Sequence, residues 1–249
     1  MKGVFETKSL ISAFTGPLSS LSRVTEEGGI TLHVSKADKT INIYALNQPA
    51  AIMTNIVYKD LFTNFEINED EKVGILSIPK FIDFFDILDS DKVEINYDSK
   101  LNSFSLDGGA LGNGVFKTAD TDLIKDSPKS FKGYAWVASV EVDPNFAAFR
   151  RSLSKLGDED CVMIVGDKAK GVITFTTRSS SVEINKFVFN VTTKVDADFS
   201  TFYSKKIFQD VISTPSEKMT ISFADRLIKV ESNSKHADII YYVAKKAAK

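Results

Sequence analysis

The sequence contains one pattern twice, and an internal duplication constrains a fold more strongly than any single motif. In Lys92–Leu101 and Lys218–Leu227, lysine, isoleucine and leucine recur at the same positions. Valine, tyrosine and lysine of the first copy are matched by methionine, phenylalanine and arginine of the second. An apolar, helix-like segment precedes each copy, Phe84–Leu88 and Phe208–Ile212. These matches predict a duplicated unit of roughly 120 residues.

Alternation of apolar and polar residues dominates both halves. It is clear in Ile30–Val34, Val93–Tyr97, Val172–Phe175 and Val182–Phe189. A strand with one buried face has this period. Turn-forming segments such as Gly166–Gly171 separate the strands, and short strands joined by tight turns predict antiparallel sheets.

Four segments carry apolar residues at helical spacing instead, two in each half. The expected helices cover residues 8–23, 78–88, 144–156 and 204–214. Each half is therefore expected to contain a short strand, a helix, about four strands, a second helix and about three or four further strands.

Local signals mark the helix ends. Asp143 followed by Pro144 is a typical start, a capping residue before proline at the first helical position. Gly157 ends the same helix, and Pro215 stops the last one. The pair Gly16-Pro17 lies inside the first expected helix and should kink or break it.

A polar, charged segment with a proline joins the two halves and has no long periodicity, which is typical of a linker. It holds the apolar pair Leu123-Ile124. The predicted organisation is a domain at 1–117, a linker at 118–132 and a second domain at 133–249.

Composition bounds the class of protein. Hydrophobic residues make up 43% of the 249 residues, enough for a substantial core, while the net charge is −2. That balance argues against coating nucleic acid by sheer positive charge, although it does not exclude a local basic face. The one cysteine, Cys161, permits no internal disulfide, and no apolar run approaches the roughly 20 residues of a membrane span. We expect a cytoplasmic protein.

Motifs for catalysis are missing from the sequence. Gly108–Gly114 is glycine-rich, but no Lys-Ser or Lys-Thr comes directly after its last glycine and no helix follows, so a turn or bulge is expected. His33 and His236 lie far apart, and no metal-ligand spacing accompanies them. The acidic runs 68–71 and 158–160 fall at expected turns and are best explained as solvated loops. We expect that the protein is not an enzyme and that it binds no metal and no cofactor.

Positive charge concentrates on the expected helices. Arg151 and Lys155 are four residues apart and face away from the apolar stripe of their helix. An ordinary solvated helix face explains any one helix, but phosphate binding gains weight because both second-half helices are basic in an acidic chain. The helix with Lys80 also carries Asp83 and Asp86 and should attract DNA little. The predicted DNA contacts are Lys8, Arg23, Lys80, Arg150, Arg151, Lys155, Lys205 and Lys206.

The duplicated order, the linker and the C-terminus together resemble those of two-domain DNA sliding clamps, proliferating cell nuclear antigen and the tailed-phage clamps. The segment Ile240–Lys246 is similar to the closing strand of that family, with paired tyrosines, an aliphatic residue, alanine and lysine. Divergence, including Gly16-Pro17, favours a viral clamp, which would place the protein in the host cytoplasm.

The resemblance implies an α+β fold of two similar DNA-clamp domains, with antiparallel sheets outside and two helices per domain inside, that closes into a ring. It implies a homotrimer that encircles duplex DNA without sequence preference, tethers a DNA polymerase and is opened by a clamp-loader ATPase. Partner peptides would dock at Leu123, Ile124, Tyr242, Val243 and Ala244. For Tyr242 and Val243, ordinary strand packing is an equal alternative.

Two other functions stay open. A polymerase accessory factor of the same fold could bind DNA on an open basic face without forming a ring. The third class is a purely structural viral protein or a β-rich interaction protein.

Overall fold

The computed structural model describes residues 1–24, 29–47, 51–59, 61, 66–87, 91–109, 112–124, 127–128, 133–155, 161–178 and 187–246. Within these ranges it does not describe the side chains of Pro144, Asn145, Ala147, Ser154, Lys155 and Arg178. The chain forms two compact units. Unit 1 comprises Met1–Asn47, Met53–Lys129 and Ser234–Ile239, and unit 2 comprises Gln48–Ile52, Ser130–Asn233 and Ile240–Lys249.

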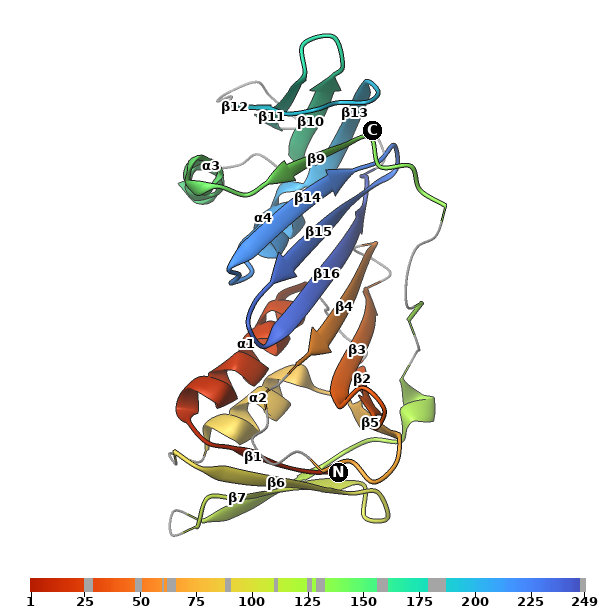
Figure 1. Ribbon diagram of the computed structural model, residues 1–249, viewed down its shortest axis with the longest axis vertical. Helices are drawn as coiled ribbons and strands as arrows, with labels where there is room; N and C mark the ends of the chain where they lie inside the picture. The colour runs from red at the N-terminus through yellow and green to blue at the C-terminus, as the bar shows by residue number, and fades with distance from the viewer. Residues whose placement is uncertain are drawn as a thin grey trace. The chain divides into compact units, whose positions relative to one another are not determined.

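The secondary structure follows the same order in both halves of the sequence (Figure 1). The first half contains β1 Lys2–Phe5, α1 Lys8–Val24, β2 Ile30–Ser35, β3 Thr40–Asn47, β4 Ile52–Tyr58, β5 Glu71–Ile75, α2 Ile78–Asp86, β6 Val93–Asp98, β7 Ser103–Asp107 and β8 Asn113–Lys117. A short 3-10 helix, η2, follows at Thr121–Leu123. The second half contains β9 Ala138–Glu141, α3 Pro144–Lys155, β10 Cys161–Asp167, β11 Val172–Arg178, β12 Val188–Thr192, β13 Phe199–Ser204, α4 Lys205–Ile212, β14 Lys218–Phe223, β15 Leu227–Asn233 and β16 Ala237–Ala244.

Strand pairing repeats as well. Neighbouring strands run β1-β6-β7-β8 in the first half and β9-β14-β15-β16 in the second. The remaining strands run β5-β2-β3-β4 and β13-β10-β11-β12. Position by position these orders are the same, and the paired registers are antiparallel. The predicted α+β fold with a duplicated helix–strand unit is confirmed, and the repeated sequence pattern falls on the equivalent strands β6 and β14.

An aromatic cluster fills the core of each unit. In unit 1 the helices α1 and α2 meet through Phe14, whose ring centroid lies 5.2 Å from that of Phe85 and 4.9 Å from that of Tyr58 on β4. In unit 2 the ring of Phe149 on α3 stacks on Phe189 of β12 at 5.3 Å. Aromatic rings bury large apolar areas and favour such tilted or offset contacts. These clusters hold the helices against the sheets.

Gly16-Pro17 was expected to kink or break the first helix, and the break is wrong, because α1 is continuous from Lys8 to Val24 with Pro17 inside it. An interior proline costs about 3 kcal/mol, mainly through the lost hydrogen bond and a clash with the preceding turn. Against that cost, α1 buries a stripe of apolar side chains, each worth about 1.5–3 kcal/mol. The stripe comprises Ile11, Phe14, Leu18 and Leu21.

A hydrogen bond from Tyr58 on β4 helps to hold α1 against the sheet. The Tyr58 hydroxyl donates a buried hydrogen bond of 2.7 Å to the carbonyl oxygen of Phe14. We expect Tyr58→Phe to lower the free energy of unfolding by about 1 kcal/mol, because the carbonyl loses a buried donor. Urea unfolding measures this, with Tyr134→Phe, at a more exposed position, as the control. Equal stability of Tyr58→Phe and the parent would contradict the assignment.

Candidate nucleic-acid interface and partner-docking site

The four helices of the described chain differ in charge from the rest of the molecule. Together they hold eight lysines and arginines and three aspartates, a net charge of +5, whereas the whole chain carries −2. Within each unit the two helices pack against each other. The net positive charge, which would attract a polyanion, therefore lies on the helices. The strands and loops together carry a net negative charge.

Helices α3 and α4 do not present all of their predicted basic residues equally. Arg151 and Lys206 are exposed. Arg150 is half-buried, and its Nη1 donates to the carbonyl oxygen of Ile212 at 3.4 Å, so that it ties the end of α4 to α3. The side chain of Lys155 lies outside the described residues.

Lys205 requires a correction. Its side chain is only 9% exposed and is unsuited to a phosphate contact. The physical reason is its place in the fold: α4 starts directly after β13 and packs against that strand, which covers the first helical residue. Sequence spacing alone placed it beside Lys206, on the rim of the apolar stripe.

Helices α1 and α2 contrast with each other. The exposed residues of α1 are Lys8, Ser9, Ser12, Ser19 and Arg23, with no acidic residue among them. Arg23 Nη2 donates to Ser20 Oγ at 3.0 Å, which fixes the cation at the helix end. On α2, Lys80, Asp83 and Asp86 are all exposed. As the sequence pattern indicated, α2 contributes little positive potential.

The linker pair is split by the fold. Leu123 is 71% exposed, whereas Ile124 is 6% exposed. Both follow Asp120, whose carboxylate accepts from the backbone N–H of Asp122 at 3.0 Å and caps the short helix η2. A partner can therefore touch Leu123, and Ile124 belongs to the core of unit 1.

The predicted docking residues of β16 are also divided. Val243 is buried in the core, Ala244 is exposed, and Tyr242 lies at the boundary with 9% of its surface exposed. Burial raises the pKa of Tyr242, while the nearby Lys229 acts in the opposite direction and Glu231 adds to the rise. For Val243 the alternative of ordinary strand packing is the better description.

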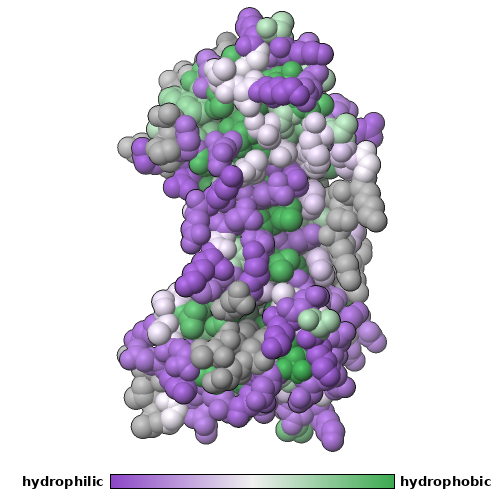
Figure 2. All heavy atoms as spheres, in the orientation of Figure 1, coloured by the Kyte–Doolittle hydropathy of each residue, from purple (hydrophilic) through white to green (hydrophobic). Residues whose placement is uncertain are grey.

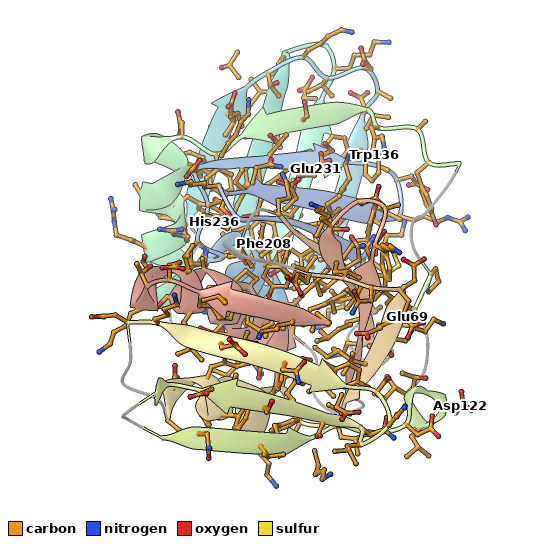
Figure 3. The ribbon with its side chains drawn as sticks, turned by 60° about the horizontal axis from the view of Figure 1, so that its bottom comes forward. Glu69, Asp122, Trp136, Phe208, Glu231 and His236 are labelled. Atoms are coloured by element: carbon orange, nitrogen blue, oxygen red, sulfur yellow. The ribbon has the colours of Figure 1, made fainter. Side chains whose placement is uncertain are left out.

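Trp136, Lys229 and Glu231 form a cluster on unit 2 that sequence reasoning missed. The Nζ atom of Lys229 lies 5.2 Å from the centre of the Trp136 ring and 2.9 Å from a carboxylate oxygen of Glu231. The side chains of Trp136 and Glu231 are labelled in Figure 3. One signal was present: Lys229 and Glu231 are two residues apart on β15, so both point to the same sheet face. Nothing in the sequence placed Trp136, the single tryptophan, next to them.

Two features are absent from the described residues. These residues contain no group of three or more His, Cys, Asp or Glu side chains arranged to hold a metal ion. In the same part of the chain no helix is both long enough and apolar enough to cross a membrane. In Figure 2 the visible surface is mainly hydrophilic, with apolar residues in separate patches.

The described glycines Gly108, Gly109 and Gly112 lie in the turn between β7 and β8. Gly109 and Gly112 lie in this turn with φ of 66° and 111°, values that favour glycine. The expected turn is confirmed.

Comparison with known proteins identifies the fold. No protein-family model and no curated protein matches the sequence. Among solved structures, a chain of the PCNA2–PCNA3 complex from Sulfolobus tokodaii matches with a TM-score of 0.76, 15% identity and 100% coverage of both chains. The Entamoeba histolytica proliferating cellular nuclear antigen matches with a TM-score of 0.76 and 14% identity, over 99% of this chain and 98% of that one. The PCNA of A. fulgidus, bound to the C-terminal region of FEN-1, gives 0.78 and 14%, over 100% and 99%. At such identities the likeness shows the clamp fold.

Proposed function

We propose that this chain is a sliding clamp, a protein that encircles duplex DNA and holds a DNA polymerase on its template. One observation carries the proposal: both units share one topology, and the whole chain matches whole PCNA chains with TM-scores of 0.76–0.78. The net positive charge of the helices in an acidic chain supports it, because a ring retained by topology needs only weak phosphate contacts. Strong contacts would slow sliding.

Ring closure is proposed through the strands β8 and β12. Of the outermost strands, β1, β5 and β9 each gain an isolated bridge, and β13 gains a backbone hydrogen bond from Lys246. Among the described residues, no such bridge reaches β8 or β12. Both alternate between exposed and half-buried residues, with Val115 65% and Val188 46% exposed. Open apolar edges invite pairing with another chain.

The two open edges belong to different units, so pairing them joins copies head to tail. A head-to-tail contact closes into a ring when its rotation closes and otherwise gives a filament. Three copies of a two-unit chain would give six repeats around the hole. We therefore propose a homotrimer. We also propose that the protein is of viral origin and acts in the host cytoplasm.

DNA would meet the exposed basic residues of the helices, Lys8, Arg23, Lys80, Arg151 and Lys206. The positive charges of Arg150 and Lys155 would add to the electrostatic attraction for DNA. The proposed partner contacts are Leu123 on unit 1, and Ala244 and Tyr242 on unit 2. The A. fulgidus PCNA carries a segment of FEN-1, which makes a short peptide the expected form of ligand. The proposed partners are a DNA polymerase and a clamp-loader ATPase.

Native mass and DNA topology test this function. We expect a species of three times 27.5 kDa in solution. Loaded protein should remain on circular DNA and slide off the linear form after the circle is cut. A strict monomer at high concentration, or equal retention on both DNA forms, would favour the accessory factor that binds DNA without enclosing it.

Charge reversal at Arg151 tests the DNA face. We expect Arg151→Glu to weaken equilibrium binding to a labelled duplex at low salt by about tenfold, because each copy loses an attraction and gains a repulsion. The matched control is Lys235→Glu, an equal charge change at an exposed turn that precedes β16. If both variants bind DNA equally well, α3 does not face the duplex.

A further inference from the structure

Gly74 is a glycine for reasons of space and not of backbone conformation. It lies within β5, is buried, and is not among the glycines with positive φ. A Cβ atom at this position would lie 2.6 Å from the carbonyl oxygen of Ala119 and 3.0 Å from Cδ1 of Ile124. Both atoms belong to the linker. The carbonyl oxygen of Ala119 is a backbone atom, so no side-chain rotation can move it away. The linker is therefore the element that excludes a side chain here.

Three contacts fix the first part of the linker on unit 1. The N–H of Ala119 donates to the carbonyl oxygen of Gly74 at 2.8 Å in an antiparallel bridge. Asp120 then caps a short turn, in which the N–H of Ile124 donates to the carbonyl oxygen of Thr121 at 3.0 Å. The buried side chain of Ile124 closes the segment. Leu123 lies between these fixed points and is the apolar residue left exposed, beside the exposed Asp120 and Asp122.

Unit 2 has an equivalent backbone hydrogen bond at a position without a glycine. There the N–H of Lys246 donates to the carbonyl oxygen of Phe202 at 2.7 Å. Ala119 and Lys246 each lie two residues past the last strand of their half, and Gly74 and Phe202 are each the fourth residue of the edge strand. This hydrogen bond alone therefore tolerates a side chain at the acceptor residue. Unit 1 requires Gly74 because the backbone carbonyl of Ala119, with the side chain of Ile124 next to it, occupies the space that a Cβ atom would take.

We infer that Gly74 and Ile124 are positioning residues for partner binding, which hold the linker so that Leu123 is presented as a pre-ordered apolar anchor. The ligand that fits is a short peptide segment with apolar side chains. A linker ordered before binding spares the ligand the cost of ordering it, and this raises affinity. The inference rests on the proposed function, since it assigns the linker a docking role.

The test compares Gly74→Ala with Gly16→Ala. The control makes the same chemical change at a helical position where an added Cβ meets nothing within 4 Å. The probe is a labelled peptide selected from a random library on the parent protein and shown to lose binding to Leu123→Glu. We expect Gly74→Ala to speed amide hydrogen exchange at Ala119, Leu123 and Ile124 and to weaken peptide binding about tenfold. The native mass should stay that of Gly16→Ala and of the parent.

Ile124→Ala provides a second route, because it keeps Gly74 and removes the buried side chain. Ile124→Ala should also lower the affinity for the same labelled peptide. Unchanged peptide affinity in both variants, with binding still dependent on Leu123, would overturn the positioning role and leave the docking function intact. Failure to recover any peptide that depends on Leu123 would overturn the docking role of the linker itself. Unchanged hydrogen exchange at the three amides would overturn the claim that Gly74 holds the linker in place.

Discussion

Val115→Asp should convert the assembled protein into single chains of 27.5 kDa. Val115 is among the most exposed large apolar residues and lies in the middle of β8, the open edge strand of its sheet. If β8 pairs with β12 of the next copy, an aspartate here brings a carboxylate into a dry sheet interface with no cation opposite. An unpaired buried charge costs several kcal/mol. We expect the dissociation constant to rise by more than about 100-fold, measured by sedimentation or native mass.

Leu101→Asp is the matched control for that change. Leu101 is also apolar, 62% exposed and in unit 1, but it sits in the turn between β6 and β7. Its variant should keep the parent mass. Loss of assembly in both variants would point to general damage, and retention in both would remove β8 from the interface.

Mixing two variants distinguishes the mode of pairing. Val188→Asp should disrupt assembly from the β12 side, as Val115→Asp does from the β8 side. Each variant keeps one intact edge, so an equal mixture should form a capped pair of twice 27.5 kDa through the single contact of two intact edges. Isologous pairing of β8 with β8 predicts otherwise, because Val188→Asp alone would then remain assembled.

The sequence predicted the features that depend on local periodicity. Strand and helix order follow from periods of 2 and 3.6 residues, which neighbouring units do not alter. The start of α3 was also predictable, because Asp143 accepts from the N–H of Phe146 at 2.8 Å as a capping residue does. Such signals are contained in a few consecutive residues.

The features that the sequence could not supply depend on tertiary neighbours. Leu123 and Ile124 look equivalent in the sequence, and only the course of the linker over β5 decides which one is buried. Lys205 looks as basic as Lys206 until β13 covers it. Pro17 looked like a helix breaker because the local cost is visible in the sequence, whereas the packing that offsets it is not.

Phe149→Ala should be the most destabilising single change in unit 2. The side chain is fully buried, and four rings surround it: Phe146 at 5.6 Å, Phe175 at 5.4 Å, Phe187 at 6.0 Å and Phe189 at 5.3 Å between centroids. Truncation removes the apolar transfer free energy and leaves a cavity, a loss of about 3–5 kcal/mol. Domains are stable by only about 5–15 kcal/mol, so unit 2 should unfold at a much lower urea concentration.

The location of the damage makes the test specific. Hydrogen exchange should quicken in β10 and β11, while amides of β2 and β6 in unit 1 keep their protection, because a second aromatic cluster around Phe14 maintains that core. Phe14→Ala should give the reverse pattern. Leu123→Ala, at an exposed site, should change stability by less than about 0.5 kcal/mol. Uniform loss of protection after either core change would mean that the two units unfold as one, and the duplication would then describe topology without separate stability.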